Sequence, residues 1–305
     1  MMQNNSDYLA VGDGHELFYE CWGNPEGKKF IFIHGGPGGG CGERDQQFFD
    51  PEQDCVLFFD QRGSARSKPF GSLEANNTDH LVEDINKLLD HVGWTESVHF
   101  FGGSWGSTLI LVYAIRYPER VRSMILRGIY LSLPEQYDLF MLDQVERFRP
   151  DAWAQLMELV PEDQQQDPSL YYAEMLQHED PEVREKHAYA YSYYEISISR
   201  LASSAKENHE VMKNFAYESM AIMESHYTRQ QCFLPDNYIL DNTDKIAHIP
   251  TTIVHGMYDI VCLPIQAHML HEKLENCELH MTVSGHSSSE PETKEKLQVA
   301  VRAAL

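Results

Sequence analysis

The sequence predicts an α/β protein built on a doubly wound, mostly parallel β-sheet, and three observations support this prediction. Short, continuously apolar runs at residues 30–33, 56–59 and 98–101 are typical of strands that are covered on both faces. An amphipathic helical segment separates the second run from the third, as in a βαβ unit. The third run leads into GGSWG at residues 102–106 and then into a helical stretch, which gives a strand, a sharp turn and a helix.

The elements before this turn follow from the spacing of apolar residues. Residues 16–22 mix apolar and polar side chains, as an edge or antiparallel strand does. The second apolar run ends in a charged turn at 60–67, where we expect Asp60 and Arg62 to pin a loop. Apolar residues recur at helical spacing through residues 78–91, so this segment is expected to pack on the sheet as a helix.

The alternation of helix and strand continues beyond the turn and resumes near the C-terminus. The expected elements are a helix at 107–117, strands at 124–126, 252–255 and 279–283, and helices at 263–274 and around Leu297 to Ala304.

A long stretch from about residue 132 to residue 234 has a different character. Strand-like runs are missing there, acidic residues and glutamines are frequent, and tyrosines cluster. We interpret this stretch as a helical insertion. The predicted organisation is therefore a core formed by residues 1–131 and 236–305, with residues 132–235 as a helical cap.

Composition and charge exclude several classes of function. A net charge of −23 over 305 residues disfavours binding to nucleic acids and to anionic membranes, and it favours cationic ligands such as amines. No apolar run approaches the roughly 20 residues of a membrane span, and the N-terminus does not resemble a secretory signal, so a cytoplasmic location is expected. The six cysteines are far apart, which favours free thiols over a zinc site or a disulfide framework.

The central turn has the form of a nucleophile elbow. Gly102 and Gly106 let neighbouring backbone approach closely, while Ser104 is expected to stand exposed at the strained tip with its hydroxyl free to react. Two glycines beside a serine also make an ordinary loop, so the interpretation depends on context. The strand before the turn and the helix after it supply that context.

A glycine-rich loop, HGGPGGG at residues 34–40, follows the first buried strand. Backbone N–H groups in such a loop can point at an anion, so Gly35 and Gly36 could form half of an oxyanion hole. A flexible turn is the simpler alternative. A phosphate-binding loop is disfavoured because no Gly-Lys-Ser or Gly-Lys-Thr follows.

The partners of Ser104 are predicted by position. In folds with this elbow, an acid follows a late strand and a histidine follows the last one, and Asp259 and His286 occupy these places in the order Ser, Asp, His. His286 would take the proton of the Ser104 hydroxyl, Asp259 would orient and stabilise the imidazolium, and backbone N–H groups of Trp105 and of the glycine loop would bind the oxyanion. The long separation of Ser104 from Asp259 independently requires an insertion.

Four segments together resemble the proline iminopeptidase family. They are HGGPGG at 34–39, DQRG at 60–63, GGSWGS at 102–107 and LRGI at 126–129, and the similarity runs from Gly12 to Tyr130 and returns from Ile249 to His286. The resemblance implies an α/β-hydrolase fold with a helical cap. It also implies a serine aminopeptidase that releases an N-terminal residue, typically proline, from small peptides without a metal or another cofactor.

The resemblance also suggests substrate-binding residues. Glu195 and Glu224 match the cap carboxylates that hold the α-amine of the substrate, although glutamates on helices otherwise usually face solvent. Arg127 and Tyr130 match a segment that borders the substrate pocket.

Three departures from the family pattern leave the preferred first residue open. Tyrosines replace the family's tryptophans at Tyr191 and Tyr194, and Met257 replaces an arginine.

Two other functions compete with the aminopeptidase. An esterase or amidase of the same fold would not require a free amine on its substrate. A binding module without catalysis is disfavoured by the complete set of Ser104, Asp259 and His286. An epoxide hydrolase or dehalogenase is disfavoured because those relatives carry aspartate where Ser104 stands. The oligomeric state is not predicted.

Overall fold

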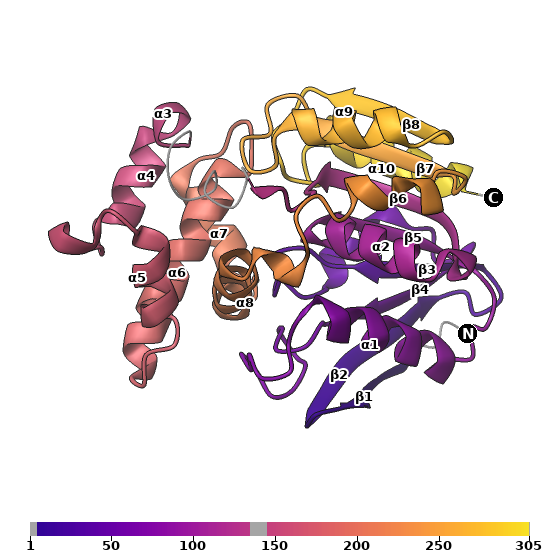
Figure 1. The fold of residues 1–305 in the computed structure, drawn as a ribbon, viewed down its shortest axis with the longest axis horizontal. Coiled ribbons are helices and arrows are strands. Elements are labelled where there is room, and N and C mark those ends of the chain that lie inside the picture. The colour runs from indigo at the N-terminus through magenta and orange to yellow at the C-terminus, as the bar shows by residue number, and fades with distance from the viewer. Residues whose placement is uncertain (1–4, 135–144, 305) are drawn as a thin grey trace.

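The strands form a single mixed sheet in the computed structural model, which describes residues 5–134 and 145–304. Within these residues the sheet has eight strands in the order β1-β2-β4-β3-β5-β6-β7-β8 (Figure 1). The bounds are β1 (Asn5–Gly12), β2 (His15–Gly23), β3 (Lys28–Ile33), β4 (Asp54–Phe59), β5 (Val98–Ser104), β6 (Val121–Ile129), β7 (Thr251–Gly256) and β8 (Cys277–Thr282).

Most of this sheet is parallel. β3 pairs with β4 and with β5, and β5 to β8 follow in parallel register, whereas β1–β2 and β2–β4 are antiparallel. β2 is antiparallel to both of its neighbours, as its mixed composition predicts, but it is not at the edge. β1, which we did not predict, lies outside it. The predicted fold class, a doubly wound and mostly parallel sheet, is confirmed.

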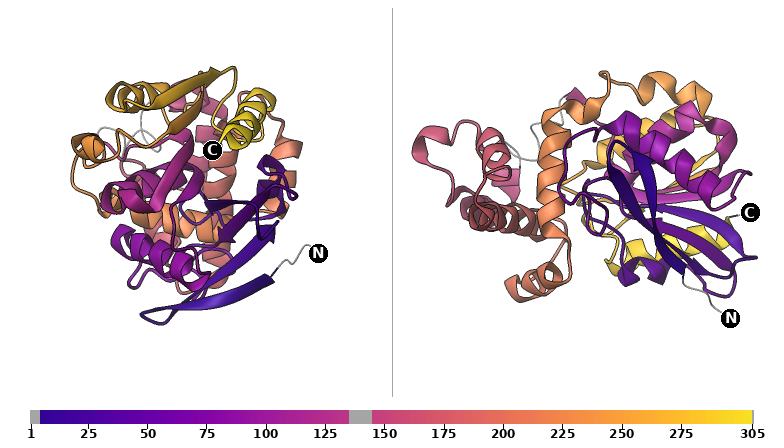
Figure 2. Two further views of the ribbon diagram at one scale, coloured as in Figure 1. Left: turned by 90° about the vertical axis from the view of Figure 1, so that its right-hand side faces the viewer. Right: turned by 90° about the horizontal axis from the view of Figure 1, so that it is seen from below.

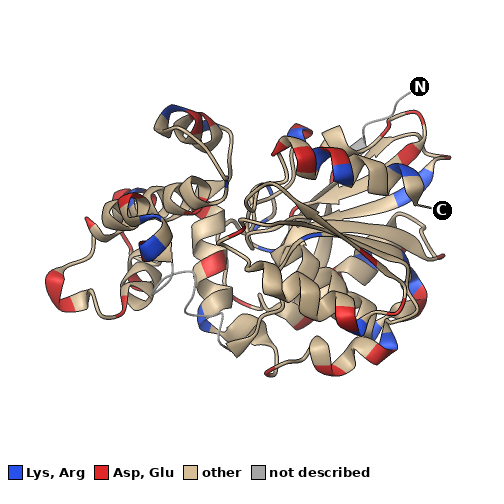
Figure 3. Cartoon of the chain, turned by 90° about the horizontal axis from the view of Figure 1, so that it is seen from above, with Lys and Arg blue, Asp and Glu red and all other residues tan. Residues whose placement is uncertain are grey.

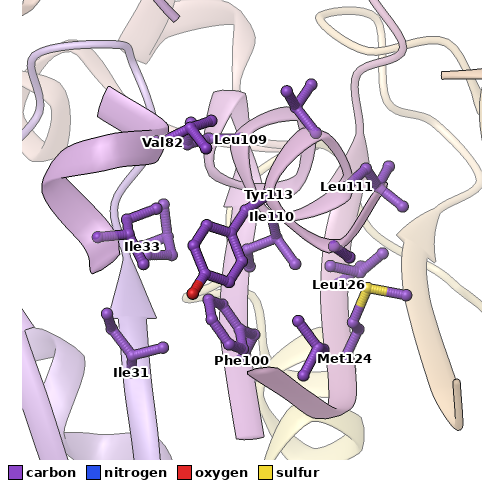
Figure 4. Packing of buried hydrophobic residues seen from close by; sticks show 14 of the residues in the cluster. Ile31, Ile33, Val82, Phe100, Leu109, Ile110, Leu111, Tyr113, Met124 and Leu126 are labelled. Atoms are coloured by element: carbon purple, nitrogen blue, oxygen red, sulfur yellow. The ribbon is translucent and has the colours of Figure 1, made fainter. Parts of the chain in front are cut away.

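Successive residues of the central strands point to opposite faces, and helices cover both faces. Ile31 and Ile33 of β3 belong to a cluster formed with α1 (Thr78–His91), α2 (Trp105–Arg116) and α9 (Pro264–Lys273), part of which appears in Figure 4. The phenylalanines of β3, Phe30 and Phe32, belong instead to a second cluster with α10 (Pro291–Ala303) and the 3₁₀ helix η1 (Glu43–Phe48). Strands covered on both faces must be apolar at every position, which explains the continuous apolar runs.

Helices are the only regular elements among the described residues from 145 to 229, and they lie beyond one end of the sheet (Figures 1 and 2). They are α3 (Val145–Phe148), α4 (Pro150–Met157), α5 (Pro168–Met175), α6 (Pro181–Ile198), α7 (Ala205–Lys213) and α8 (Tyr217–Arg229), with a short 3₁₀ turn η4 (Glu162–Gln164). The clustered tyrosines Tyr172, Tyr191 and Tyr194 are buried in a separate hydrophobic cluster of these helices. The domain boundaries at residues 132 and 235 stay a prediction.

Helix α8 holds these helices against the core. The Ser219 hydroxyl donates to the carbonyl oxygen of Gly38 at 2.8 Å and accepts from the N–H of Ala65 at 3.0 Å. About two turns further on, the Tyr227 hydroxyl donates to Asn76 Oδ1 at 2.8 Å. A Cβ on Gly38 would lie 2.3 Å from the Ser219 carbonyl oxygen, so glycine is required for this close packing. The glycine loop of the core is therefore bound directly to α8.

Candidate active site

Ser104 stands at a strained position where β5 becomes α2. Its backbone has φ 57° and ψ −130°, a region that costs a non-glycine residue about 1–3 kcal/mol and that persists only where the surroundings enforce it. The surroundings include Gly106, where a Cβ would lie 2.2 Å from the carbonyl oxygen of Ile33. This tight packing of α2 on the end of β3 fixes the turn.

The expected exposure of Ser104 is wrong. The residue is only 8% exposed, because the helices of residues 145–229 cover this end of the sheet. Ser104 instead lines a cavity of about 520 Å³ between the core and these helices. The buried Cys262 is a neighbour of Ser104 that the sequence did not indicate; burial raises the pKa of this thiol, and the Ser104 hydroxyl opposes the rise.

Asp259 and His286 meet as predicted from their order in the chain. His286 Nδ1 lies 2.7 Å from Asp259 Oδ2, and both side chains are buried. The other oxygen, Asp259 Oδ1, accepts the N–H groups of Val261 and Cys262 at 2.9 and 2.8 Å. Burial alone would raise the pKa of Asp259, but the charge and hydrogen bond of His286 outweigh it and lower this pKa. The carboxylate therefore stays ionised and holds the ring.

Arg127 occupies the other side of the histidine. Its Nη1 lies 3.0 Å from His286 Nε2 and 2.9 Å from the main-chain oxygen of His286. A guanidinium can only donate, so Nε2 accepts and the ring proton resides on Nδ1, facing Asp259. This is the tautomer that a general base needs. Gly103 leaves room for Arg127, because a Cβ there would lie 2.5 Å from its Nε.

The predicted oxyanion donors surround Ser104. A Cβ on Gly35 would lie 3.3 Å from Ser104 Cβ, so the glycine loop passes directly beside the serine. Gly36 lines the same cavity, and its φ of 108° requires glycine. Trp105 begins α2, where backbone N–H groups lack partners within the helix. The placement suits an oxyanion hole, and that role stays a prediction.

Gln61 connects the glycine loop to Trp105, and the sequence did not predict this role. Its side-chain amide donates to the carbonyl oxygen of His34 at 2.9 Å and accepts from the indole N–H of Trp105 at 2.9 Å. Its own N–H donates to His34 Nε2 at 2.9 Å, so His34 Nδ1 carries the proton and donates to Gly35. Burial lowers the pKa of His34, which keeps this ring neutral.

Asp60 and Arg62 pin the surrounding loop, as expected. Asp60 forms a bidentate pair with Arg66, and Arg62 forms a buried bidentate pair with Asp84.

Glu195 on α6 and Glu224 on α8 form a buried carboxyl pair. They are 8% and 5% exposed, and their side chains hydrogen-bond to each other. Burial raises the pKa of both, most strongly that of Glu224, where the charge of Glu195 adds to the effect. One oxygen of each, Oε2, has no hydrogen-bond partner. Glu195 lines the cavity that also holds Ser104, so a cation there can reach it, whereas Glu224 lies behind it and is not among the residues that line the cavity.

The remaining predicted residues lie at different depths. Arg127 lines the cavity but is engaged with His286. Tyr130 packs against the main hydrophobic cluster, with its hydroxyl 3.8 Å from the thiol of Cys232, and it is not among the residues that line the cavity. Tyr191 and Tyr194 are buried, whereas Met257 is 48% exposed.

The structure reveals neither a metal site nor a membrane helix in the part of the chain that it describes. No group of three or more His, Cys, Asp or Glu side chains is arranged to hold a metal ion in residues 5–134 and 145–304. Among the same residues, no helix has the length and apolar character needed to cross a bilayer.

Comparison with known proteins shows consistent similarities. A family model described as the alpha/beta hydrolase fold matches residues 28–292. The chain is 38% identical to a proline iminopeptidase of Arabidopsis thaliana over 299 residues, which cover 97% of this chain and 78% of the relative. It is also 38% identical to a proline iminopeptidase of Neisseria meningitidis serogroup A over 302 residues, which cover 97% and 95%.

Solved structures share the fold at low sequence identity. A thermophilic esterase from Thermogutta terrifontis superposes with a TM-score of 0.68 at 17% identity, covering 98% of this chain and 97% of the esterase. A proline iminopeptidase-related protein from Thermus thermophilus has a TM-score of 0.63 at 20% identity, covering 100% and 98%.

Proposed function

Because this chain belongs to the proline iminopeptidase family of α/β-hydrolases, we propose that it releases the N-terminal residue, proline above all, from small peptides through an acyl-enzyme on Ser104. The observation that carries this proposal is the buried pair of Glu195 and Glu224, of which Glu195 lines the cavity that holds Ser104. A pair of carboxyl groups with two unpartnered oxygens suits a substrate ammonium. An esterase has no use for such a pair, which costs stability in the free enzyme.

The chemistry follows from the groups around Ser104. When the substrate binds, His286 Nε2 exchanges Arg127 for the Ser104 hydroxyl and takes its proton as Oγ attacks the scissile carbonyl carbon. The carbonyl oxygen becomes an oxyanion, held by the backbone N–H of Trp105 and those of the Gly35–Gly36 turn. Collapse breaks the C–N bond, and the leaving amine takes the proton from His286. Water then attacks the acyl-enzyme as His286 takes its proton, and His286 returns a proton to Ser104 Oγ as the amino acid is released.

Glu195 and Glu224, which we call the ammonium anchor, explain why a single residue is removed. Glu195 and Glu224 sit at a fixed distance from Ser104, because α6 and α8 pack against each other and α8 is bound to the core. A substrate bound one residue further along would bury its ammonium without a partner and leave the pair uncompensated.

The thiols support a reducing compartment, and we place the reaction in the cytoplasm. All six cysteines are free, and three of them are buried.

The experiment that tests this function compares free and blocked substrates. Prolyl-naphthylamide, other aminoacyl-naphthylamides and their N-acetyl counterparts are offered to the wild type and to Ser104→Ala. We expect the wild type to hydrolyse only the substrates with a free amine, and the prolyl substrate fastest. Ser104→Ala should show no turnover but keep its fold, because the substitution removes only one hydroxyl group.

The same experiment separates the alternatives. Equal rates on free and blocked substrates would identify an esterase or amidase without an amine requirement. If the wild type fails to label with a fluorophosphonate, the protein is a binding module and the proposed function is wrong.

A further inference from the structure

The cavity around Ser104 has a polar wall that neither acyl transfer nor the ammonium anchor uses. It is formed by η1, by the loop after α6, by α7 and by the serine loop after His286. The side chains concerned are Arg44, Gln47, Arg200, Asn214, Ser288 and Ser289. These groups come from both the core and the helices of residues 145–229, so the wall closes the cavity where the two parts meet.

Two guanidinium groups on this wall are available to a ligand. Arg200 donates to the Ser289 hydroxyl at 3.3 Å, and no carboxylate of the described residues lies within 4 Å of it. Arg44 lies over the ring of Phe215 at 4.8 Å, and it forms a long ion pair with Asp45, 3.8 Å from its Nε to Asp45 Oδ2, which is beyond hydrogen-bond distance and leaves its N–H groups able to bind a ligand. In a chain with a net charge of −23, Arg200, which lines the cavity without a carboxylate partner, indicates an external anion.

The acidic groups of the same wall already have their own donors. Glu210 pairs with Lys213, which lies on the same helix. Asp45 accepts the N–H of Gly42 at 2.8 Å, and burial raises the pKa of Asp45 although the charge of Arg44 opposes the rise. Among the described residues, the only other carboxylate that lines the cavity is Glu195, which belongs to the ammonium anchor. Glu195 is thus the cavity carboxylate with an unpartnered oxygen, Oε2.

The two groups that would receive the ends of a short peptide lie close together in the chain. Glu195 lies near the end of α6, which ends at Ile198, and Arg200 follows five residues later in the loop after this helix; both line the cavity. An extended dipeptide spans about 7 Å from its amine to its carboxylate at about 3.3–3.6 Å per residue. The flexible arginine side chains extend this reach to a tripeptide.

We propose that Arg200 and Arg44 bind the α-carboxylate of the leaving peptide, so that dipeptides and tripeptides with a free C-terminus are the preferred substrates. The inference rests on the proposed function, since it names the substrate class of the same site. Charge-assisted hydrogen bonds from guanidinium groups to a carboxylate, with help from the hydroxyls of Ser288 and Ser289, supply the recognition.

The test compares prolyl-alanine with prolyl-alanine amide, which differ only in the terminal charge. In the wild type we expect kcat/KM for the acid to exceed that for the amide about tenfold or more. Arg200→Gln should lower the value for the acid about tenfold, and the half-exposed Arg44→Gln should lower it about threefold. Neither variant should change kcat/KM for the amide or for prolyl-naphthylamide, which has no carboxylate.

A matched control removes one positive charge from α6, the helix that precedes Arg200, away from the cavity. Arg184 lies near the start of α6 and donates to the main-chain oxygens of His178 and Glu179. Arg184→Gln should leave kcat/KM for all three substrates unchanged. Equal wild-type rates on acid and amide, or an equal loss on both in Arg200→Gln, would overturn the inference alone. If the wild type does not hydrolyse prolyl-naphthylamide, the proposed function is overturned and the inference with it.

Discussion

At the scale of single residues, Glu195 and Glu224 have the most unusual environment in the site. Two carboxyl groups cannot both ionise when they lie buried against each other, so the free enzyme holds a proton between them. A bound ammonium favours the ionised form of both groups, so that proton leaves as the substrate binds. Substrate affinity and proton release are therefore linked.

The Glu→Gln variants test the anchor. An amide keeps the hydrogen bond of the pair but removes one negative charge, and charge-assisted hydrogen bonds are worth about 1.5–3 kcal/mol. We expect Glu195→Gln and Glu224→Gln each to lower kcat/KM for prolyl-naphthylamide about tenfold to a hundredfold. Hydrolysis of a butyryl ester, which has no amine, should change little, and the exposed Glu185→Gln on α6 serves as control. An equal loss on the ester would contradict the anchor.

Glu224→Gln should also stabilise the protein at high pH. The folded pKa of Glu224 is raised above its value in the unfolded chain, about 4.3. Such a group contributes stability below the unfolded pKa, and that stability is lost as the pH rises through the folded pKa. Glu224→Gln cannot ionise, so its Tm should exceed that of the wild type by about 1–3 °C at pH 8 and by less at pH 5. Calorimetry at pH 5 and at pH 8 measures this difference in Tm. A difference that is the same at both pH values would show that ionisation of the Glu224 carboxyl does not destabilise the folded protein in this range.

The sequence identifies the reacting residues better than it identifies the anchor. Ser104, Asp259 and His286 follow from their order and from the ends of strands. Nothing local marks Glu195 and Glu224, because a glutamate on a helix usually faces solvent, and only the family resemblance singled them out. Burial of these two side chains depends on how α6 and α8 pack on the core, which a helical pattern does not encode.

At the scale of elements, Gln61 is the connection on which the geometry of the glycine loop depends. Its side chain is hydrogen-bonded to His34 at the end of β3 and to Trp105 at the start of α2, so one amide sets the spacing between the two groups of predicted oxyanion donors. Replacing it would leave a buried carbonyl oxygen and an indole N–H without partners, at about 1–3 kcal/mol each.

Gln61→Ala should therefore lower kcat more than it raises KM. We expect kcat for prolyl-naphthylamide to fall about tenfold. This loss is smaller than the hundredfold or greater loss that follows complete removal of an oxyanion donor, because the donors would be displaced and not removed. Chemical denaturation should show a loss of about 2–4 kcal/mol in the free energy of unfolding. The exposed Gln53→Ala is the matched control. A variant with normal kcat would show that the glycine loop holds its position without Gln61.

Elements with a strong apolar pattern were predicted and elements without one were not. β4 and β5 are buried at every position, so their apolar runs are unmistakable. β1 lies at the edge of the sheet, and Val11 is its only fully buried apolar residue, so its sequence shows little strand signal. Likewise, β6 extends from Val121 to Ile129 although only residues 124–126 were expected, because Arg122 and Arg127 interrupt its apolar run.

At the scale of the whole molecule, the negative charge is spread over both parts. Figure 3 marks acidic residues both on the core and on the helices beyond the sheet, and the net charge of −23 attracts a cation from a distance. We expect kcat/KM for the cationic prolyl-naphthylamide to fall about two- to threefold between 20 mM and 500 mM NaCl, because salt screens this field. The zwitterionic prolyl-alanine should respond less. Identical salt dependence for both substrates would mean that the overall charge does not steer association.

The bond between Ser219 and the glycine loop restricts how the cavity can fill. Helix α8 carries Glu224 and is fastened through Ser219 to Gly38 and Ala65, so these helices cannot swing away as a rigid lid without pulling on the loop that holds Gly35 and Gly36. Traffic of substrate and product must then rely on rotations of side chains, which take picoseconds to nanoseconds, rather than on the microsecond-to-millisecond hinge motions that limit many enzymes. The turnover number should accordingly be insensitive to solvent viscosity when glycerol or sucrose is added.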